Sequence, residues 1–323
     1  TPNTVLNRLF KLVKTKAEKY QIYLLIDEYD HFANELIAFH FQDYQDIVSR
    51  NGYVRKFYEA IKTATGEGVV DRIFITGVSP ITLDSFTSGF NISRNLTTDL
   101  NLHQMMGFTS EEVQELMINI GVPTQKLAEV MFDLKQWYNG YLFNEDAPHR
   151  LYNPDMVLYF ALEYQKVKAY PKNLLDTNIA SDYGKLHRMF RIGEQDEQHY
   201  EVIEELLLHN ELSASLTAQF SFEKRFDKDD FISLLFYLGM ITIKGSQLDG
   251  LIFQRPNYVI GELYYDYFRE IMLQRAQLSG DQLRIRARVI KLAQENNPAP
   301  FVEVVEQVLS SLSNRDSMGF DEK

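Results

Sequence analysis

The chain has 323 residues, of which 45% are hydrophobic and 13% aromatic, and this is enough to build a sizeable core divided over two or three units. Its 33 basic and 45 acidic side chains give a formal net charge of −12, which opposes broad, sequence-independent attraction to nucleic acid or anionic lipid. The absence of cysteine excludes disulfides, thiolate metal sites and a cysteine nucleophile.

Hydropathy excludes a further class of protein. No apolar run approaches the roughly 18 to 20 residues that a membrane helix needs, and the first residues lack the order of a signal peptide. We therefore expect a cytoplasmic protein without a membrane partner. The seven histidines are scattered without ligand spacing, so no zinc site is predicted.

The first part of the chain alternates predicted helices and strands. Apolar residues at helical spacing predict helices over 3–19 and 53–64. Short apolar runs predict fully buried strands at 22–26 and within 72–80, the second closed by Thr, Gly and Pro. This order predicts an α/β fold with parallel strands, in which ligands bind at the carboxyl ends of the strands.

From about residue 100 the pattern becomes helical. Thr109 and Glu112 form a capping box that begins a helix, and Asn153-Pro154 is a second start signal. The aromatic segment 136–143 lies between them. We expect its Trp137, Tyr138 and Tyr141 to fill the core between helices, with base stacking as the less favoured alternative.

The last third predicts a helix followed by a hairpin. A buried helix from Phe231 breaks at Gly239 into a strand, residues 244–250 form a turn, and a second strand returns to Asn257, which is the outline of a winged helix. Residues 221–262 carry five basic and six acidic side chains, so a packing role is favoured over DNA contact. A further helix follows, and 281–312 is predicted to be helical with a break at 297–300.

Two adjacent carboxylates follow the first predicted strand. In Mg-ATP chemistry one carboxylate holds the hydrated metal and another orients or deprotonates the attacking water. Asp27 and Glu28 stand where both tasks are possible, although a strand running into a solvated acidic loop explains them equally well. Asp30 is either a supporting partner of this site or, the favoured alternative, a surface carboxylate.

Two further side chains are candidates for phosphate contacts. Thr76 ends the neighbouring strand, where a residue that senses the γ-phosphate would lie, but capping of the turn at 77–80 is favoured from the residues alone. Arg94 lies beyond and is a candidate trans-acting finger, against the favoured alternative of a solvated loop arginine. The phosphate-binding loop itself, Gly-x-x-x-x-Gly-Lys-[Ser/Thr], does not occur in the sequence.

Six motifs in order resemble the AAA-ATPase-like proteins of bacteria and archaea, P-loop proteins that usually carry a C-terminal domain of the PD-(D/E)XK nuclease superfamily. The resemblance covers at least residues 1–160, and residues 235–257 are similar to the winged-helix segment that follows. The motifs are Leu24-Leu-Ile-Asp-Glu-Tyr-Asp30, Phe74-Ile-Thr-Gly-Val-Ser-Pro80, Phe86-Thr-Ser-Gly-Phe-Asn-Ile92, Met106-Gly-Phe-Thr-Ser-Glu-Glu-Val113, Trp137-Tyr-Asn-Gly-Tyr141 and Tyr152-Asn-Pro154.

The resemblance implies an α/β fold: a partial P-loop, AAA-like parallel sheet core followed by a helical subdomain and a winged-helix-like unit. We expect the later part of the ATPase core at 1–100 and the helical subdomain at 101–220. The winged-helix-like unit is expected at 221–275, and a helical linker toward a C-terminal domain at 276–323.

The resemblance also implies roles for the candidate residues. Asp27 would hold Mg²⁺, Glu28 would act on water and Thr76 would sense the γ-phosphate, with ATP and Mg²⁺ as cofactors. The phosphate loop, or Walker A segment, would precede residue 1, so we expect this chain alone to be inactive and to bind nucleotide weakly.

Three functions compete. The leading hypothesis is an AAA-ATPase-like domain fragment that carries the Walker B half of a nucleotide site and is coupled to a nuclease or other effector domain. The alternatives are a non-catalytic interaction module with a degenerate P-loop fold, and DNA contact through the winged helix. Asp155, Glu163 and Lys166 do not form a nuclease motif, because the last spacing is one residue too long and the segment is predicted to be one helix.

Overall fold

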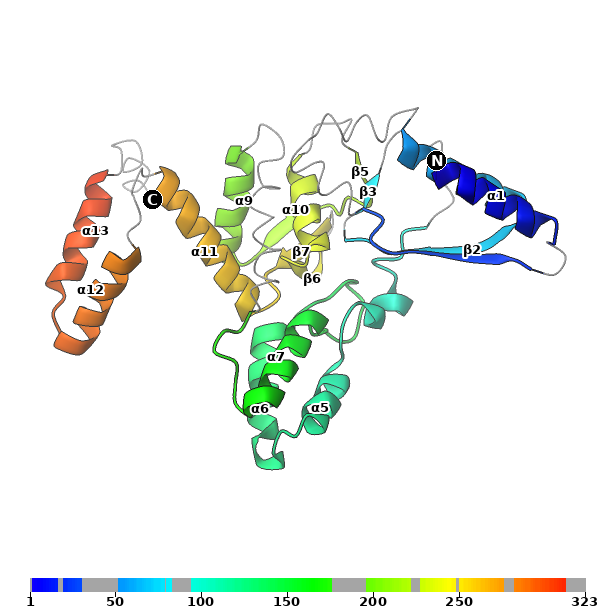
Figure 1. The fold of residues 1–323 in the computed structure, drawn as a ribbon. Helices are drawn as coiled ribbons and strands as arrows, with labels where there is room; N and C mark the ends of the chain where they lie inside the picture. Colours follow the sequence, from blue (N-terminus) through cyan, green and yellow to red (C-terminus); the bar gives the residue numbers. More distant parts are fainter. Residues whose placement is uncertain are drawn as a thin grey trace. The chain divides into compact units, whose positions relative to one another are not determined.

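The computed structural model describes residues 2–16, 20–30, 52–78, 80–82, 94–175, 196–221, 227–247, 250–275 and 282–311 (Figure 1). The chain divides into two compact units, residues 1–263 and 264–323. Among the described helices, none combines the length and the apolar composition that crossing a membrane requires.

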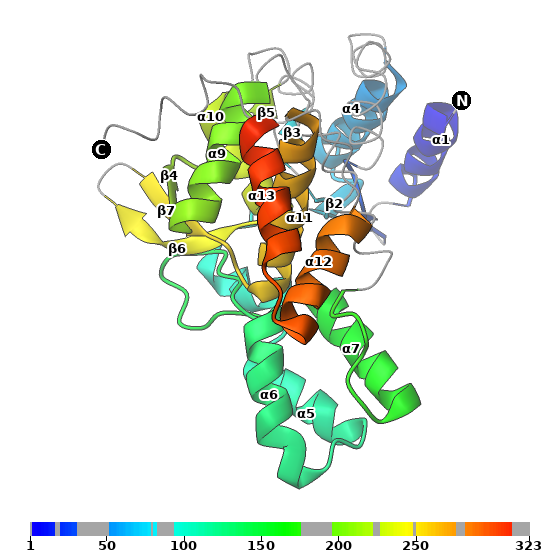
Figure 2. The same cartoon turned by 90° about the vertical axis from the view of Figure 1, so that its left-hand side faces the viewer.

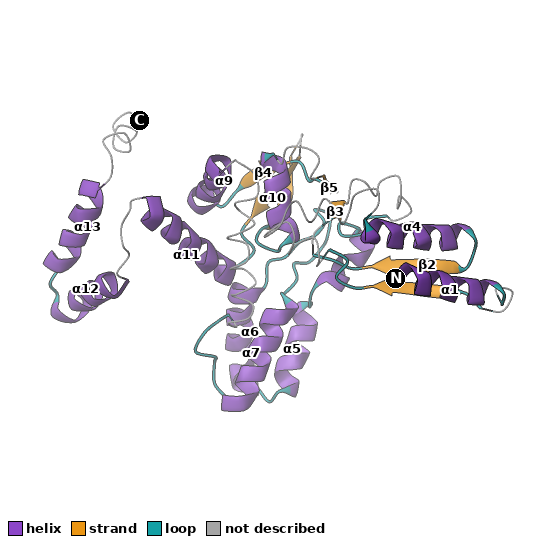
Figure 3. Cartoon of the chain, turned by 45° about the horizontal axis from the view of Figure 1, so that its top comes forward, coloured by secondary structure: helices purple, strands orange, loops and turns teal. Residues whose placement is uncertain are grey.

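The described residues at the start of the first unit form two helices and two parallel strands. The elements are α1 (Pro2–Lys14), β1 (Ile22–Ile26), α4 (Tyr53–Gly66) and β2 (Val70–Ile75). β1 pairs with β2 in parallel, with Ile26 opposite Ile75 at the end of the ladder. Figure 3 shows the two strands as adjacent arrows beside α1 and α4. Because the strands are parallel, their carboxyl ends meet at one edge.

One face of this small sheet packs against α1 and α4, and side chains on the other face are exposed. Phe10 of α1 and Ile61 of α4 belong to a core that also takes Leu24 and Ile73 from the strands. On the opposite face three large apolar side chains are exposed, Tyr23 by 66%, Leu25 by 77% and Phe74 by 45%. The prediction of fully buried strands is therefore wrong for β1 and β2, because α1 and α4 pack on the same face.

In the helical part of the first unit, two helices begin where the sequence predicted. It comprises the 3-10 helix η2 (Leu100–Met106) and the helices α5 (Ser110–Asn119), α6 (Thr124–Tyr138) and α7 (Pro154–Val167). The helices α5, α6 and α7 contact one another (Figure 3). The Thr109–Glu112 capping box is complete, and the Asn153 side chain accepts a hydrogen bond from Met156 N. Both start signals are confirmed.

The aromatic segment joins the helical part to the hairpin that follows in the chain. Tyr138 and Tyr141 are buried, which confirms the core role for these two residues, whereas Trp137 is half-buried. The hydroxyl of Thr242 accepts a hydrogen bond from Leu142 N and donates one to Leu142 O. Gly140 lies against Pro256 with a φ of 118°, and a Cβ there would lie 2.7 Å from the Pro256 carbonyl carbon. Only glycine fits this approach.

Two helices and a three-stranded sheet follow in the described part of the first unit. The elements are α9 (Asp196–His209), β4 (Leu212–Ala214), α10 (Lys228–Tyr237), β6 (Thr242–Gln247) and β7 (Gly250–Gln254). The strands are antiparallel in the order β4-β7-β6 (Figure 2). Gly239 ends α10 with a φ of 71°, as the sequence predicted. β6 extends to Gln247, so most of the expected turn at 244–250 is strand.

Two short elements and three helices remain. β3 (Ile81–Thr82) pairs in parallel with β5 (Phe220–Ser221) within the first unit. α11 (Tyr258–Arg275) spans the boundary between the two units, and α12 (Gln282–Glu295) and α13 (Ala299–Ser311) contact each other in the second. The predicted break between α12 and α13 at 297–300 is confirmed, with α13 beginning at Ala299.

Candidate functional site at the end of the parallel strands

The carboxyl ends of β1 and β2 are joined by backbone and side-chain hydrogen bonds. Thr76 N donates to Ile26 O at 2.8 Å, and Tyr29 N donates to Thr76 O at 3.0 Å. The hydroxyl of Thr76 donates to Oδ1 of Asp27. The structure thus brings Thr76 and Asp27 into contact. The sequence predicted only that both residues lie at the same edge, because each follows a predicted parallel strand.

Glu28 turns the chain sharply at this edge. Its φ of 50° lies in the left-handed region, which a non-glycine residue occupies at a cost of about 1–2 kcal/mol. Glu28 N donates to Oδ1 of Asp27 at 3.1 Å, so this oxygen accepts from both Glu28 and Thr76. Asp27, Glu28 and Thr76 are all solvent-exposed, and a hydrated cation or a phosphate has access to them.

The favoured prediction that Asp30 is a surface carboxylate is wrong. It is 1% exposed, and both carboxylate oxygens accept from Val78 N, each at 3.1 Å. Gly77 permits this approach, because a Cβ at that position would lie 2.6 Å from Asp30 Oδ1 and would overlap the Tyr29 ring. The carboxylate is therefore a buried anchor for the loop after β2.

A buried tyrosine lies in the electrostatic field of Asp30. Burial, and then the negative charge of Asp30, raise the pKa of Tyr58 to about 12. Tyr58 belongs to α4 and is 5% exposed. The charge of Asp30 therefore acts on the core side of the sheet, whereas Asp27 and Glu28 lie on the solvent side.

The donor set at the strand ends fits Mg²⁺ better than a metal that needs several protein ligands. Magnesium is bound through one or two carboxylates, retained waters and substrate phosphates. Within the described ranges, no group of three or more His, Cys, Asp and Glu side chains could hold a metal ion. Asp27 and the Thr76 hydroxyl supply oxygen atoms only, so a metal here would complete its shell with water and phosphate.

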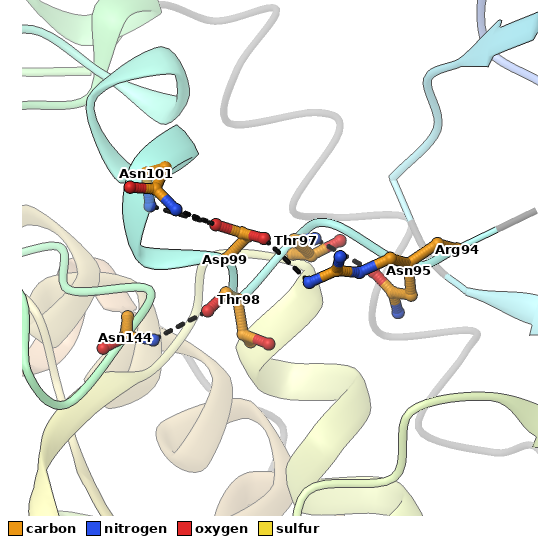
Figure 4. Close-up of polar contacts among 7 residues, drawn as sticks. All are labelled: Arg94, Asn95, Thr97, Thr98, Asp99, Asn101 and Asn144. Atoms are coloured by element: carbon orange, nitrogen blue, oxygen red, sulfur yellow. Dashed lines mark hydrogen bonds and ion pairs between the residues drawn. The ribbon is translucent and has the colours of Figure 1, made fainter.

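Arg94 belongs to a different group of polar contacts (Figure 4). Its Nη2 lies 3.1 Å from Oδ2 of Asp99, and its side chain is 81% exposed. Asp99 Oδ1 also accepts from Asn101 N and so caps η2. Asn144 Nδ2 donates to Thr98 O at 2.7 Å. Arg94 is thus a surface loop arginine held beside a helix cap, and its role as a finger stays a prediction.

From the sequence, a supporting role for Asp30 is the less favoured alternative, and Gly77 belongs only to the turn after Thr76. Neighbouring residues do not separate the two alternatives for Asp30, because its burial depends on the contact with Val78. The residues Asp155, Glu163 and Lys166 of α7 do not form a second site. Lys166 Nζ forms an ion pair with Glu163 at 2.6 Å, three residues away on the same helix. Phe86–Asn91, part of a recognised motif, lies outside the described residues.

The fold and the site define a mixed α/β protein in which two parallel strands present an acidic pair and a threonine at one edge. Residues 1–87 match the family model described as Predicted AAA-ATPase, and this match supports an AAA-ATPase-like assignment. It includes β1, β2, Asp27, Glu28, Asp30 and Thr76. Neither the search of curated proteins nor that of solved structures found a match.

Proposed function

We propose that the edge formed by Asp27, Glu28 and Thr76 is the Walker B half of a Mg-ATP site. The observation that carries the proposal is the hydrogen bond from the Thr76 hydroxyl to Asp27, which brings a hydroxyl donor and an exposed carboxylate together at the strand ends. The family match over residues 1–87 supports the same class of site. Solvent exposure of all three residues leaves room for the ligand.

Each side chain has a separate task in this proposal. Asp27 holds the hydrated metal through its carboxylate, with Oδ1 already oriented by Glu28 N and Thr76. Glu28 takes the proton from the attacking water, whose oxygen bonds to the γ-phosphorus as the bond to the β,γ-bridging oxygen breaks. The Thr76 hydroxyl donates a hydrogen bond to a γ-phosphate oxygen when ATP is bound. Bound Mg²⁺ neutralises charge on the phosphate oxygens.

These residues carry no loop of the kind that holds nucleotide phosphates. The sequence contains no Gly-x-x-x-x-Gly-Lys-[Ser/Thr] motif. Backbone N–H groups and the lysine of that loop supply much of the affinity for phosphates. We therefore propose weak nucleotide binding by these 323 residues, on the order of millimolar.

The decisive experiment measures metal-nucleotide affinity. Free Mn²⁺ is followed by its EPR signal while the chain is titrated into Mn-ATP. Asp27→Ala should weaken binding by about tenfold or more, because it removes the metal-binding carboxylate. Asp155→Ala, which removes a first-turn acid from α7, is the matched control and should leave the affinity unchanged. Equal affinity for the wild type and Asp27→Ala would sink the proposal.

The coupling of this site to an effector is also a proposal. The family resemblance implies a C-terminal nuclease-type domain as the partner. The α10–β6–β7 segment is the winged-helix-like unit of that arrangement, and its acidic balance over 221–262 favours protein packing over DNA. An absence of duplex DNA binding at low salt would agree with packing, whereas steeply salt-dependent binding would favour DNA contact.

A second candidate function rests on the outer face of the sheet. Tyr23, Leu25 and Phe74 expose an apolar surface of the kind that marks protein contact sites. This favours an interaction module whose sheet packs against further protein. Sedimentation equilibrium of the wild type and Leu25→Lys over a concentration range tests self-association. Identical monomeric behaviour of the two proteins would argue against self-association through this face.

A further inference from the structure

We infer that Asp30 is a positioning residue for Thr76, holding the loop after β2 so that the Thr76 hydroxyl meets Asp27. This inference rests on the proposed function of the site but concerns a residue to which that function assigns no chemistry. Asp30 itself is 1% exposed and faces the loop backbone, so it has no access to metal or water.

The turn after β1 is hydrogen-bonded to the residues after β2 at two points, an outer one at Asp27 and an inner one at Asp30. At the outer point Asp27 accepts from the Thr76 side chain. At the inner point Asp30 accepts from Val78 N with both oxygens. Between them Tyr29 N donates to Thr76 O. Thr76 therefore lies in a segment that hydrogen bonds hold on both sides. Loss of the inner contact frees the backbone at Val78, two residues after Thr76.

The local sequence is adapted to the inner point. Glu28 adopts a left-handed conformation, and this turn directs Asp27 and Asp30 to different sides of the edge, one exposed and one buried. Gly77 has no side chain to obstruct the Asp30 carboxylate or the Tyr29 ring. A buried carboxylate is costly unless it is well satisfied, and a loop amide shared by both oxygens is one such partner.

The alternative is that Asp30 only stabilises the core. Both roles predict lower stability for Asp30→Ala, so stability does not separate them. They differ in what happens to Thr76. Positioning predicts that Thr76 is disturbed although its own partners, Ile26 O and Asp27, remain in place. A purely structural role predicts that the disturbance stays at Val78 or spreads evenly through the core.

Residue-resolved amide hydrogen exchange tests the inference without any ligand. In Asp30→Ala, exchange of the Thr76 amide should accelerate about tenfold, together with Val78, while Ile61 in α4 stays protected. Asp227→Ala is the matched control: it removes a helix-capping carboxylate that accepts from Asp230 N and should accelerate the first turn of α10 only. Acceleration confined to Val78 would overturn the inference.

A conservative variant covers the case in which Asp30→Ala does not fold. Asp30→Asn keeps one acceptor oxygen but loses the charge and the second oxygen, and hydrogen bonds to a charged acceptor are about twice as strong as neutral ones. Thr76 exchange should then rise roughly two- to fivefold, between the wild type and Asp30→Ala. Wild-type exchange at Thr76 in Asp30→Asn would overturn the inference.

A double-mutant cycle on Mn-ATP affinity links Asp30 to the site. If Asp30 acts through Thr76, the pair Asp30→Asn and Thr76→Val should bind no more weakly than Thr76→Val alone. If the fold-losses of Mn-ATP affinity caused by the two changes multiply in the double variant, the positioning role of Asp30 is contradicted. Failure of the wild type to bind Mn-ATP would refute the proposed function instead, and the exchange measurement would still decide the place of Asp30.

Discussion

The hydroxyl of Thr76 donates a hydrogen bond to Oδ1 of Asp27, a carboxylate 49 residues earlier in the chain. The two residues follow paired parallel strands, so their contact depends on the register that sets Ile26 opposite Ile75. The same carboxylate oxygen accepts from Glu28 N. In the proposed site Asp27 would hold the cation, and a bound phosphate would give the Thr76 hydroxyl a second acceptor.

Removing the Thr76 hydroxyl should weaken Mn-ATP binding. Thr76→Val keeps the shape of the side chain but loses the donor to Asp27, and a hydrogen bond to a charged group contributes about 1.5–3 kcal/mol. We expect roughly a tenfold loss of affinity by EPR titration. Thr63→Val is the control, because that hydroxyl donates to Glu59 O within its own helix. A similar loss in both variants would contradict a specific role for Thr76.

Gly140 should be among the most sensitive positions for folding. Gly140→Ala places a Cβ against the Pro256 carbonyl at a φ of 118°, and we expect the free energy of unfolding to fall by about 2–4 kcal/mol. The only tryptophan, Trp137, lies three residues away and reports the transition by fluorescence in urea. Gly66→Ala meets open space at the end of α4 and should be neutral or slightly stabilising.

The capping box of α5 should contribute measurably to the helical part. The Thr109 side chain accepts from Glu112 N while Glu112 accepts from Thr109 N, so Thr109→Ala leaves the Glu112 N–H without its capping acceptor. We expect a loss of about 1 kcal/mol in the same fluorescence assay. Thr109→Ser retains the hydroxyl and should lie within about 0.5 kcal/mol of the wild type. Equal losses in the two variants would contradict the capping role.

Alkaline pH should destabilise the fold through Tyr58. Burial and the charge of Asp30 raise the pKa of Tyr58 from 10.0 to about 12 in the folded protein. The folded state therefore keeps a proton that the unfolded state releases. The associated stability is complete below pH 10 and is lost as the pH rises toward 12.

The Tyr58→Phe variant tests this pH dependence. It has no phenol to ionise, so its free energy of unfolding should fall less between pH 10 and 12 than that of the wild type. Tyr23→Phe removes an exposed phenol and should follow the wild-type curve. A Tyr58→Phe curve parallel to the wild type would show that Tyr58 does not contribute.

Local signals predicted much of the fold, whereas contacts between distant segments were beyond them. The bounds of β1, the caps at Thr109 and Asn153 and the break at Gly239 follow from neighbouring residues. The exposed face of β1 depends on which side α1 and α4 cover, and an apolar run carries no such information.

The candidate site divides in the same way. Asp27 and Thr76 were identifiable as candidates because each directly follows an apolar strand, and Glu28 because it is the acidic neighbour of Asp27. The burial of Asp30 arises from Val78, 48 residues later, and from the close approach at Gly77. The sequence around Asp30 is polar and acidic, so local composition favours an exposed side chain. Only the tertiary contact reverses that expectation.

The most direct test of the central claim locates the metal on the protein. Methyl-labelled chain is titrated with Mn-ATP, and paramagnetic broadening is recorded for Ile26 and Ile75, which immediately precede Asp27 and Thr76. We predict selective broadening of these two residues, sparing Val130 in α6, that Asp27→Ala abolishes and excess Mg-ATP reverses. Broadening elsewhere with Ile26 and Ile75 unaffected, or broadening that persists in Asp27→Ala, would contradict a Mg-ATP site at the end of the parallel strands.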